Sequence, residues 1–395
     1  MTATTQAPAV VPGSRAHTDG AGAVVPVQTR SARPTSYSPE DFGAPSGREV
    51  NWKHTPVDRI TGVLDLAAAS TDASVTITAP DGVEITTKAI GEAPRGEAFV
   101  PEDLSGALAW QRSSEASHVR IPASLELSEP VLIDVTGVTE LTHQHLVIEA
   151  AENSHATVLL RHSGPALFAQ NVEIIVRDGA NLKVVSVQQW DDEAVHVAAH
   201  QARVDRDASL RHVVVSFGGG VVRVNPSLEL SGAGSHGEMF GLSYADAGQH
   251  LESQVFLHHK GAETSGDVLY KGALQGEGAR SVWIGDVLIG PDATGTDSYE
   301  ANRNLVLTDG ARADSIPNLE IQTGDIRGAG HASATGRFDD EQLFYLQARG
   351  ISEDEARRLV VLGFLTEIVQ KIGIDSLEAE LIAAVEEELA QEGTR

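Results

Sequence analysis

The stretch Val172–Val187, which reads VEIIVRDGANLKVVSV, decides how the rest of the chain is interpreted. Its first five residues and its last six are rich in β-branched side chains, and the small pair Gly179-Ala180 lies between the two runs. β-Branched residues favour the pleated strand, and a glycine allows the tight turn that joins two strands. The stretch therefore predicts two short strands connected by a turn.

Runs of the same kind recur from about residue 118 to residue 326, and several alternate apolar and polar residues, which is typical of half-buried strands. Further Gly-Ala pairs lie at 232–233, 261–262, 278–279 and 310–311. Helical patterns of about 10–15 residues do not separate the runs, which disfavours a doubly wound α/β fold. This pattern of short strands and small turns favours a mainly β chain with a parallel β-helix core at 118–326, and an antiparallel sandwich is the alternative.

The N-terminal part has a different composition. Residues 1–45 are rich in Ala, Pro, Thr, Ser and Gly and have little amphipathic periodicity, which predicts a disordered tail. A mixed or helical segment is expected at 46–117. In it, Trp52 stands among polar residues shortly before Pro56. We interpret Trp52 as an anchor that docks this segment onto the β core.

The C-terminal region, residues 327–395, is expected to be helical. A first helix starts with acids near Asp340 and ends before Gly350, a residue type that favours helix termination. Ser352 and Glu355 have the spacing of a capping box for a second helix, which ends near Gly373. A last helix follows. Its apolar face and that of the second helix are too wide to be left in water, so both should pack on the body or on a partner.

Composition excludes several classes of function. The formal net charge of −27 opposes binding to nucleic acid and to anionic membranes. The chain has no cysteine, so it cannot form a disulfide, use a thiolate nucleophile or bind a cluster through its own sulfur. We find neither a signal peptide nor an apolar run of about 20 residues that could span a bilayer. A cytoplasmic location is expected.

Motifs for nucleotide binding and catalysis are weak or missing. The segment 232–237, GAGSHG, matches the dinucleotide fingerprint by letter, but a strand-like run follows it, so we interpret it as a turn. The P-loop pattern does not occur, and we expect this chain to bind no ATP. The acids Asp191–Glu193 are interpreted as a solvated loop. His143 and His145 share one face of a strand, whereas His258 and His259 point to opposite faces.

Segments around the end of the β region resemble a known family. They are PNLEI at 317–321, GHASATG at 330–336, DEQLFYL at 340–346 and RGI at 349–351. Upstream, ANRNL at 301–305 and Trp52 with Thr55-Pro56 are similar in the same order. Together these segments, from about residue 48 to residue 372, resemble the SufB/SufD family of iron–sulfur cluster assembly proteins. The absence of cysteine favours the SufD branch.

The resemblance implies a right-handed parallel β-helix flanked by an N-terminal segment and a C-terminal helical domain. It also implies a non-catalytic scaffold that pairs with a SufB-like subunit and docks a SufC-like ABC ATPase. Iron, or a transient cluster shared with the SufB-like subunit, would be the cargo, and flavin binding is left open. By resemblance, His331 is a candidate metal ligand, although GAG precedes it where many relatives have Cys-x-His. The candidate partner-binding residues are Glu341, Phe344, Tyr345, Arg358 and Phe364.

Two other functions compete with this interpretation. A carbohydrate-active β-helix enzyme would use a groove of acids, for which Asp191–Glu193 is the candidate cluster, and would usually be secreted. A stand-alone scaffold would instead form a homodimer through the strand edges of its own β-helix. Co-elution with purified partner proteins would separate both alternatives from the assembly subunit.

Overall fold

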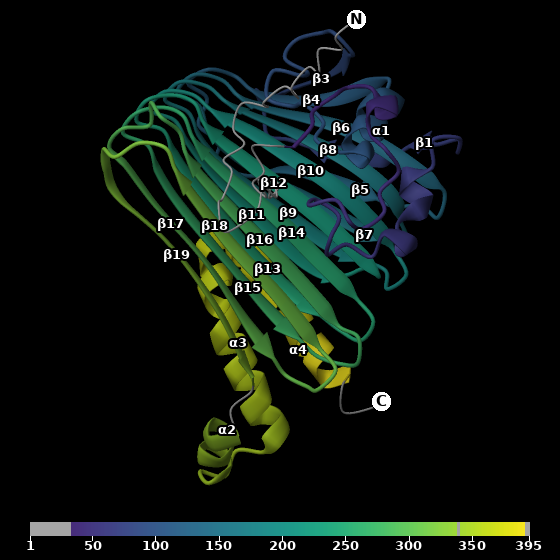
Figure 1. The fold of residues 1–395 in the computed structure, drawn as a ribbon, viewed down its shortest axis with the longest axis vertical. Coiled ribbons are helices and arrows are strands. Elements are labelled where there is room, and N and C mark those ends of the chain that lie inside the picture. The colour runs from purple at the N-terminus through teal and green to yellow at the C-terminus, as the bar shows by residue number, and fades with distance from the viewer. Residues whose placement is uncertain (1–32, 338–339, 392–395) are drawn as a thin grey trace, which may run out of the picture.

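The computed structural model describes residues 33–337 and 340–391. In this part of the chain, strands β4 to β19 wind into a parallel β-solenoid of about eight turns, and helices α2 to α4 follow it (Figure 1). The solenoid strands are β4 (Glu115–Ile121), β5 (Val131–Thr136), β6 (Leu141–Ala150), β7 (His155–Gly164), β8 (Leu167–Val176), β9 (Asn181–Trp190), β10 (Val195–Val204), β11 (Ser209–Gly218), β12 (Val221–Leu230), β13 (His236–Ala245), β14 (His250–His259), β15 (Ser265–Leu274), β16 (Arg280–Ile289), β17 (Thr296–Val306), β18 (Arg312–Ile321) and β19 (Ile326–Arg337).

The strands form two sheets that face each other across a packed interior. Sheet A has the order β18-β16-β14-β12-β10-β8-β6-β4-β3, and sheet B has the order β19-β17-β15-β13-β11-β9-β7-β5-β2. Each inner strand of the solenoid therefore pairs with the strands one turn before and after it, and equivalent residues stack in columns. Ile174 on β8, for example, lies between Ile148 on β6 and Ala202 on β10. This architecture confirms the expected parallel β-helix and excludes the antiparallel sandwich.

The column packing explains the small residues between strands. The stretch that reads VEIIVRDGANLKVVSV forms the end of β8, a turn and most of β9, as predicted. Gly179 in this turn has a φ of 68°, which glycine adopts without strain. A side chain at Gly232 would overlap the backbone nitrogen of Arg206 in the coil below. The segment 232–237 is thus a turn followed by the start of β13, and it does not form a dinucleotide site.

The N-terminal segment covers the first coils and the outer face of sheet A. It contains the 3₁₀ turns η2 (Pro39–Asp41), η3 (Val57–Arg59) and η4 (Thr61–Leu64), the strands β1 (Thr71–Asp72), β2 (Ser74–Thr78) and β3 (Glu84–Ala89), and helix α1 (Leu104–Arg112). Strand β2 pairs antiparallel with β5, and β3 pairs antiparallel with β4. Trp52 is buried against the body, with only 3% of its surface exposed, which confirms its predicted role as an anchor.

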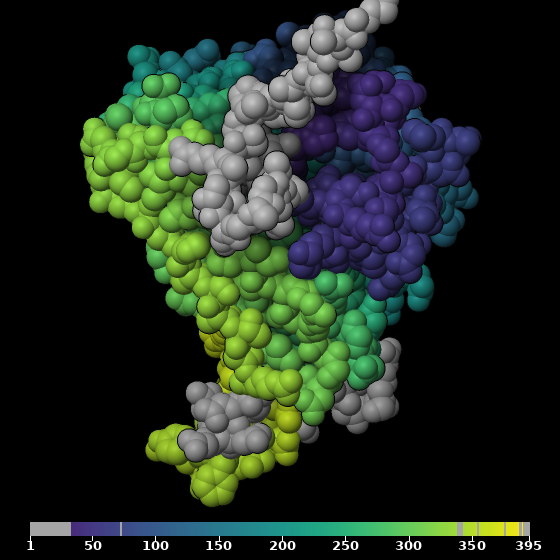
Figure 2. All heavy atoms as spheres, in the orientation of Figure 1, coloured from purple at the N-terminus to yellow at the C-terminus, as the bar shows by residue number. Residues whose placement is uncertain are grey.

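The C-terminal helices are α2 (Asp340–Gln347), α3 (Glu353–Ile372) and α4 (Asp375–Gln391). The Ser352 side chain accepts the N–H of Glu355 at the start of α3, and Gly373 ends the helix in the left-handed conformation, as the sequence predicts. Helices α3 and α4 pack on the outer face of sheet B through a shared apolar cluster. Helix α2 lies at the far tip of the molecule, beyond the last strands (Figures 1 and 2).

Two expected boundaries were wrong. Residues 1–32 of the expected tail lie outside the described residues, but residues 33–45 pack on the body, where the Tyr37 hydroxyl donates to the Phe99 carbonyl at 2.9 Å. The β region also continues beyond residue 326, because β19 extends to Arg337. Pairing with β17 imposes the strand on a glycine- and alanine-rich segment whose own strand propensity is low. Within the described residues, every helix falls short of the length and apolarity needed to cross a membrane.

Candidate functional site

The last coil of the solenoid is the candidate site, because its strands are only half covered. In the described residues, β18 pairs with β16 alone and β19 pairs with β17 alone, so each leaves one edge without a neighbouring strand. The side chains of β8 are almost all buried, whereas those of β18 are mostly half-buried and those of β19 mostly exposed. We call this surface, made by residues 312–321 and 326–337, the open end.

His331 lies on β19 at the open end. It stands one coil above Glu300 of β17 in the same column, so the two side chains enter the same part of the solenoid. The His331 Nδ1 atom is 3.7 Å from Oε1 of Glu300. The imidazole is 44% exposed, whereas the carboxyl group is fully buried. The structure thus pairs the predicted ligand with an acid that the sequence analysis did not select.

Glu300 is held in an unusual environment. Both of its carboxyl oxygens are buried without a hydrogen-bond partner. Burial, together with the nearby Asp286 carboxylate, raises the pKa of Glu300 to about 8, although the backbone of Asn318 acts in the opposite direction. The carboxyl group is therefore mostly protonated at neutral pH. It would bind a cation after releasing this proton.

The donor set of this chain is small. Among the described residues, no three His, Asp or Glu side chains come together in a way that could hold a metal ion. Glu300 and His331 supply one carboxyl oxygen and one imidazole nitrogen, both of which suit divalent first-row metals. Such a pair forms part of a metal site at most, and further ligands would have to come from outside this chain.

The structure places the five predicted partner-binding residues on α2 and α3. Phe344 is 72% exposed and Tyr345 is 56% exposed, and the Arg349 guanidinium stacks on the Tyr345 ring. Glu341 lies in the first turn of the same helix. Phe344 and Tyr345 form a small apolar surface at the tip of the molecule, which we call the α2 tip.

The other two predicted partner-binding residues are engaged within the chain. Arg358 on α3 forms ion pairs with Glu355 and with Glu386 of α4. Phe364 is half-buried, and the Lys271 ammonium lies 4.8 Å from its ring centroid. Both residues therefore hold α3 in place.

The other histidines that the sequence analysis singled out lie on inner coils. His143 and His145 share one face of β6, as expected, but both are buried and His145 packs edge-on against Trp110 of α1. The His145 Nε2 atom is 3.1 Å from a Glu173 oxygen. His259 points inward to Thr264 and Ser298, and its neighbour His258 takes the opposite side, as the alternation predicts. The acids Asp191–Glu193 form an exposed turn between β9 and β10.

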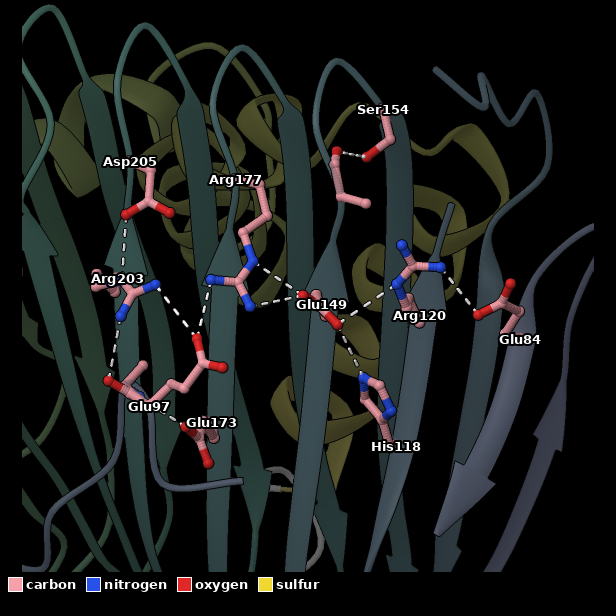
Figure 3. A network of polar contacts seen from close by, with 12 residues as sticks. Glu84, Glu97, His118, Arg120, Glu149, Ser154, Glu173, Arg177, Arg203 and Asp205 are labelled. Carbon is pink, nitrogen blue, oxygen red and sulfur yellow. Dashed lines mark hydrogen bonds and ion pairs between the residues drawn. The ribbon is translucent and has the colours of Figure 1, made fainter. Parts of the chain in front are cut away.

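A ladder of charged side chains crosses the outer face of sheet A at the other end of the solenoid (Figure 3). Acids and bases alternate along it, so that Glu149 is 2.7 Å from Arg177, and Arg177 is 2.9 Å from Glu97 of the N-terminal segment. Burial opposes ionisation of Glu149, but the contacts with His118 and Arg177 outweigh it and lower the pKa of Glu149 to about 2. The ladder fastens the N-terminal segment to the coils. Its members are Glu84, Glu97, His118, Arg120, Glu149, Arg177, Arg203 and Asp205.

The amino-acid sequence contains no direct signal for Glu300. Acidic residues are almost never fully buried, so residue type alone does not place Glu300 in the interior. The signal that was available is positional. Asn302 and Asn304 follow Glu300 at alternate positions of one strand and are also buried, so an inward-facing polar row was already present in the ANRNL segment.

These features define a β-solenoid protein with one open end and a candidate cation ligand at that end. A family model for the SufBD core domain of the SUF system for iron–sulfur cluster assembly matches residues 133–364. The chain is 48% identical to iron–sulfur cluster assembly SufBD family proteins of Mycobacterium bovis and Mycobacterium tuberculosis, over 90% of its own length and 91% of theirs. It is 25% identical to the iron–sulfur cluster assembly protein SufD of Escherichia coli, over 88% of this chain and 90% of that protein.

The chain belongs to the SufBD family of iron–sulfur cluster assembly proteins. The family match covers the solenoid from β5 to the middle of α3, including Glu300, His331 and the α2 tip. Membership confirms the resemblance inferred from the sequence. It favours a role in cluster assembly over the carbohydrate-active alternative.

Proposed function

We propose that this chain is a non-catalytic scaffold subunit of a cytoplasmic SUF-type assembly complex. The observation that carries the proposal is the open end, where two strand edges of a long parallel solenoid lack a neighbour in the described residues. Solenoids need their ends covered, and unpaired edges readily pair with another chain. A SufB-like subunit with an edge of the same kind is the proposed neighbour, since its own coils would continue both sheets.

The α2 tip is the proposed dock for a SufC-like ATPase. Phe344 and Tyr345 are large aromatic side chains that stand in water, an arrangement typical of an interaction surface. Helix α3 connects this tip to the body, where Lys271 donates to the Phe364 carbonyl at 2.7 Å and pairs with Glu367. A force applied at α2 would therefore be transmitted to sheet B through α3.

The proposed mechanism divides the chemistry among the subunits. ATP binding brings two SufC-like subunits together, which pulls on residues 339–372 and opens the interface at the open end. Iron held with the help of His331 then meets sulfur carried by the SufB-like subunit. Because this chain has no cysteine, all thiolate ligands must come from its partners. This chain contributes the framework of the site and one imidazole ligand.

Size-exclusion chromatography of the full chain mixed with SufB-like and SufC-like proteins tests the proposal. Co-elution of all three is expected, and an exposed charge placed at the open end, such as Leu319→Arg, should remove the SufB-like protein from the complex. The matched control is Leu66→Arg on the exposed N-terminal segment, which should leave the complex intact. A chain that elutes as a homodimer and ignores both proteins would support the stand-alone scaffold instead.

A further inference from the structure

Glu300 poses an energetic question that packing alone does not answer. A fully buried carboxyl group whose oxygens lack hydrogen-bond partners destabilises a fold, and it does so more strongly if it is charged. An apolar side chain of similar size would avoid this loss. Residues that lower the stability of a fold and do not contribute to its packing are typical of functional positions.

The column that contains Glu300 shows where the acid enters. From the middle of sheet B outward, the column reads His212, Met239, Val268, Glu300 and His331. The two coils below Glu300 are apolar at this position, and the acid appears only in the last buried coil, directly beneath the exposed histidine. The carboxyl group is thus placed at the open end and is absent from the coils below.

The opposite wall makes room for this side chain. Gly285 of β16 faces Glu300 across the interior, and a Cβ atom at Gly285 would lie 2.2 Å from the Trp283 ring and 2.5 Å from Oε2 of Glu300. A larger residue at position 285 would displace the Trp283 ring, the carboxyl group or both. The glycine therefore leaves the space that the ring and the carboxyl group share.

We propose that Glu300 is a second ligand, alongside His331, for divalent iron at the open end. This inference rests on the proposed function, because the partner subunit must supply the remaining ligands. Two donor atoms bound to one tetrahedral metal at about 2.1 Å lie roughly 3.4 Å apart, and the 3.7 Å between Nδ1 and Oε1 is close to this separation. The pair is a half-site that closes when a partner covers the open end.

Iron binding by the purified complex tests the inference. The complex of the full chain with its SufB-like and SufC-like partners is stripped of metal and titrated anaerobically with ferrous iron by equilibrium dialysis. Glu300→Gln and His331→Ala should each weaken binding about tenfold or more, as removal of a ligand or of its support does in other metal sites. The matched control is Asp297→Asn, an exposed acid on the same strand, which should bind iron like the unmodified chain.

The outcomes separate this inference from the proposed function. Neither Glu300 oxygen has a hydrogen bond of good geometry, so the melting temperature of Glu300→Gln should equal or exceed that of the unmodified chain. If the amide lowers stability, Glu300→Leu replaces it, and the same loss of iron is expected. Iron affinity that is unchanged in the Glu300 variant but lost in His331→Ala overturns the inference and leaves the scaffold proposal intact. Failure of the three proteins to assemble would count against the scaffold proposal itself.

Discussion

The two ends of the solenoid are built in opposite ways. At the N-terminal end, β2 and β3 run antiparallel to the first coil, and the N-terminal segment extends over the outer face of sheet A. At the C-terminal end, β18 and β19 pair parallel with the preceding coil, and in the described residues no further strand pairs with them. Because β2 and β3 are antiparallel to the coils, the parallel stack itself ends at the first coil. The described chain thus ends the parallel stack with its own antiparallel strands on one side and with parallel edges on the other.

The covered face of sheet A and the open end also differ in their electrostatics. In the middle of sheet A, under the N-terminal segment, the Arg223 guanidinium is buried, lies 3.0 Å from Asp103 and 3.3 Å from Glu252, and stacks on Trp52. Burial opposes ionisation of Glu252, but His250 and Arg223 outweigh it and lower the pKa of Glu252 to about 2. At the open end, Arg337 pairs with Asp309 while 74% and 94% of their side chains are exposed. One ion pair holds the fold together, and the other is solvated.

Removal of the two arginines should show the largest contrast. Arg223→Ala leaves Asp103 and Glu252 buried without their cation, and should lower the free energy of unfolding by about 3–5 kcal/mol. Arg337→Ala removes an exposed pair and should change it by less than about 1 kcal/mol. Urea unfolding followed by circular dichroism measures both values. Similar losses for the two variants would mean that the covered face of sheet A and the open end do not differ in this way.

The second contrast uses one interior column of sheet A. Leu228, Leu257, Val287 and Leu319 stack in successive coils. Leu257→Ala opens a cavity between two covered neighbours and should lower the free energy of unfolding by about 2–5 kcal/mol. Leu319→Ala lies in the last coil, where the side chain is only half-buried, and should lower it by roughly 1 kcal/mol.

The same pair of variants tests whether a partner covers the open end. If the SufB-like subunit packs on the last coil, Leu319→Ala should weaken that complex while Leu257→Ala leaves its affinity unchanged in the folded protein. Titration of the labelled chain with the partner measures this. Equal affinities for both variants would place the contact elsewhere.

These contrasts also show what the sequence could predict. The strand runs and Gly-Ala turns of the inner coils were recognised because each run buries β-branched residues in a repeated column. Strand β19 was missed because its sequence, which includes GAGHASATG, has little strand propensity and forms a strand only through its register with β17. Glu300 was missed because only the column places it beneath His331. Local patterns reveal the repeated part of a solenoid, whereas its end depends on contacts between distant residues.

Acid should destabilise the interior in a defined pH window. Burial lowers the pKa of His212 to about 4 from an ordinary value of 6.5. Between these two values, the unfolded chain binds a proton that the native chain does not, so the free energy of unfolding falls as the pH falls from 6.5 to 4. This histidine accounts for about 3 kcal/mol of the loss at most. Urea unfolding at pH 7 and at pH 4.5 should show a smaller difference for His212→Gln than for the unmodified chain.

The smallest expected effect on stability comes from the α2 tip, and it is compared with a substitution on α3, the helix that supports the tip. Phe344 is 72% exposed, so Phe344→Ala should change the free energy of unfolding by less than about 0.5 kcal/mol. Phe364→Ala is the matched control, because this half-buried ring packs against sheet B and its loss should lower stability by more than about 1 kcal/mol. If the tip docks the ATPase, Phe344→Ala abolishes co-elution with the SufC-like protein although the fold is intact. If the ATPase still binds the Phe344 variant but not the Phe364 variant, its binding site lies on α3 and not on α2. The force of ATP binding would then act directly on the helix that packs on the solenoid.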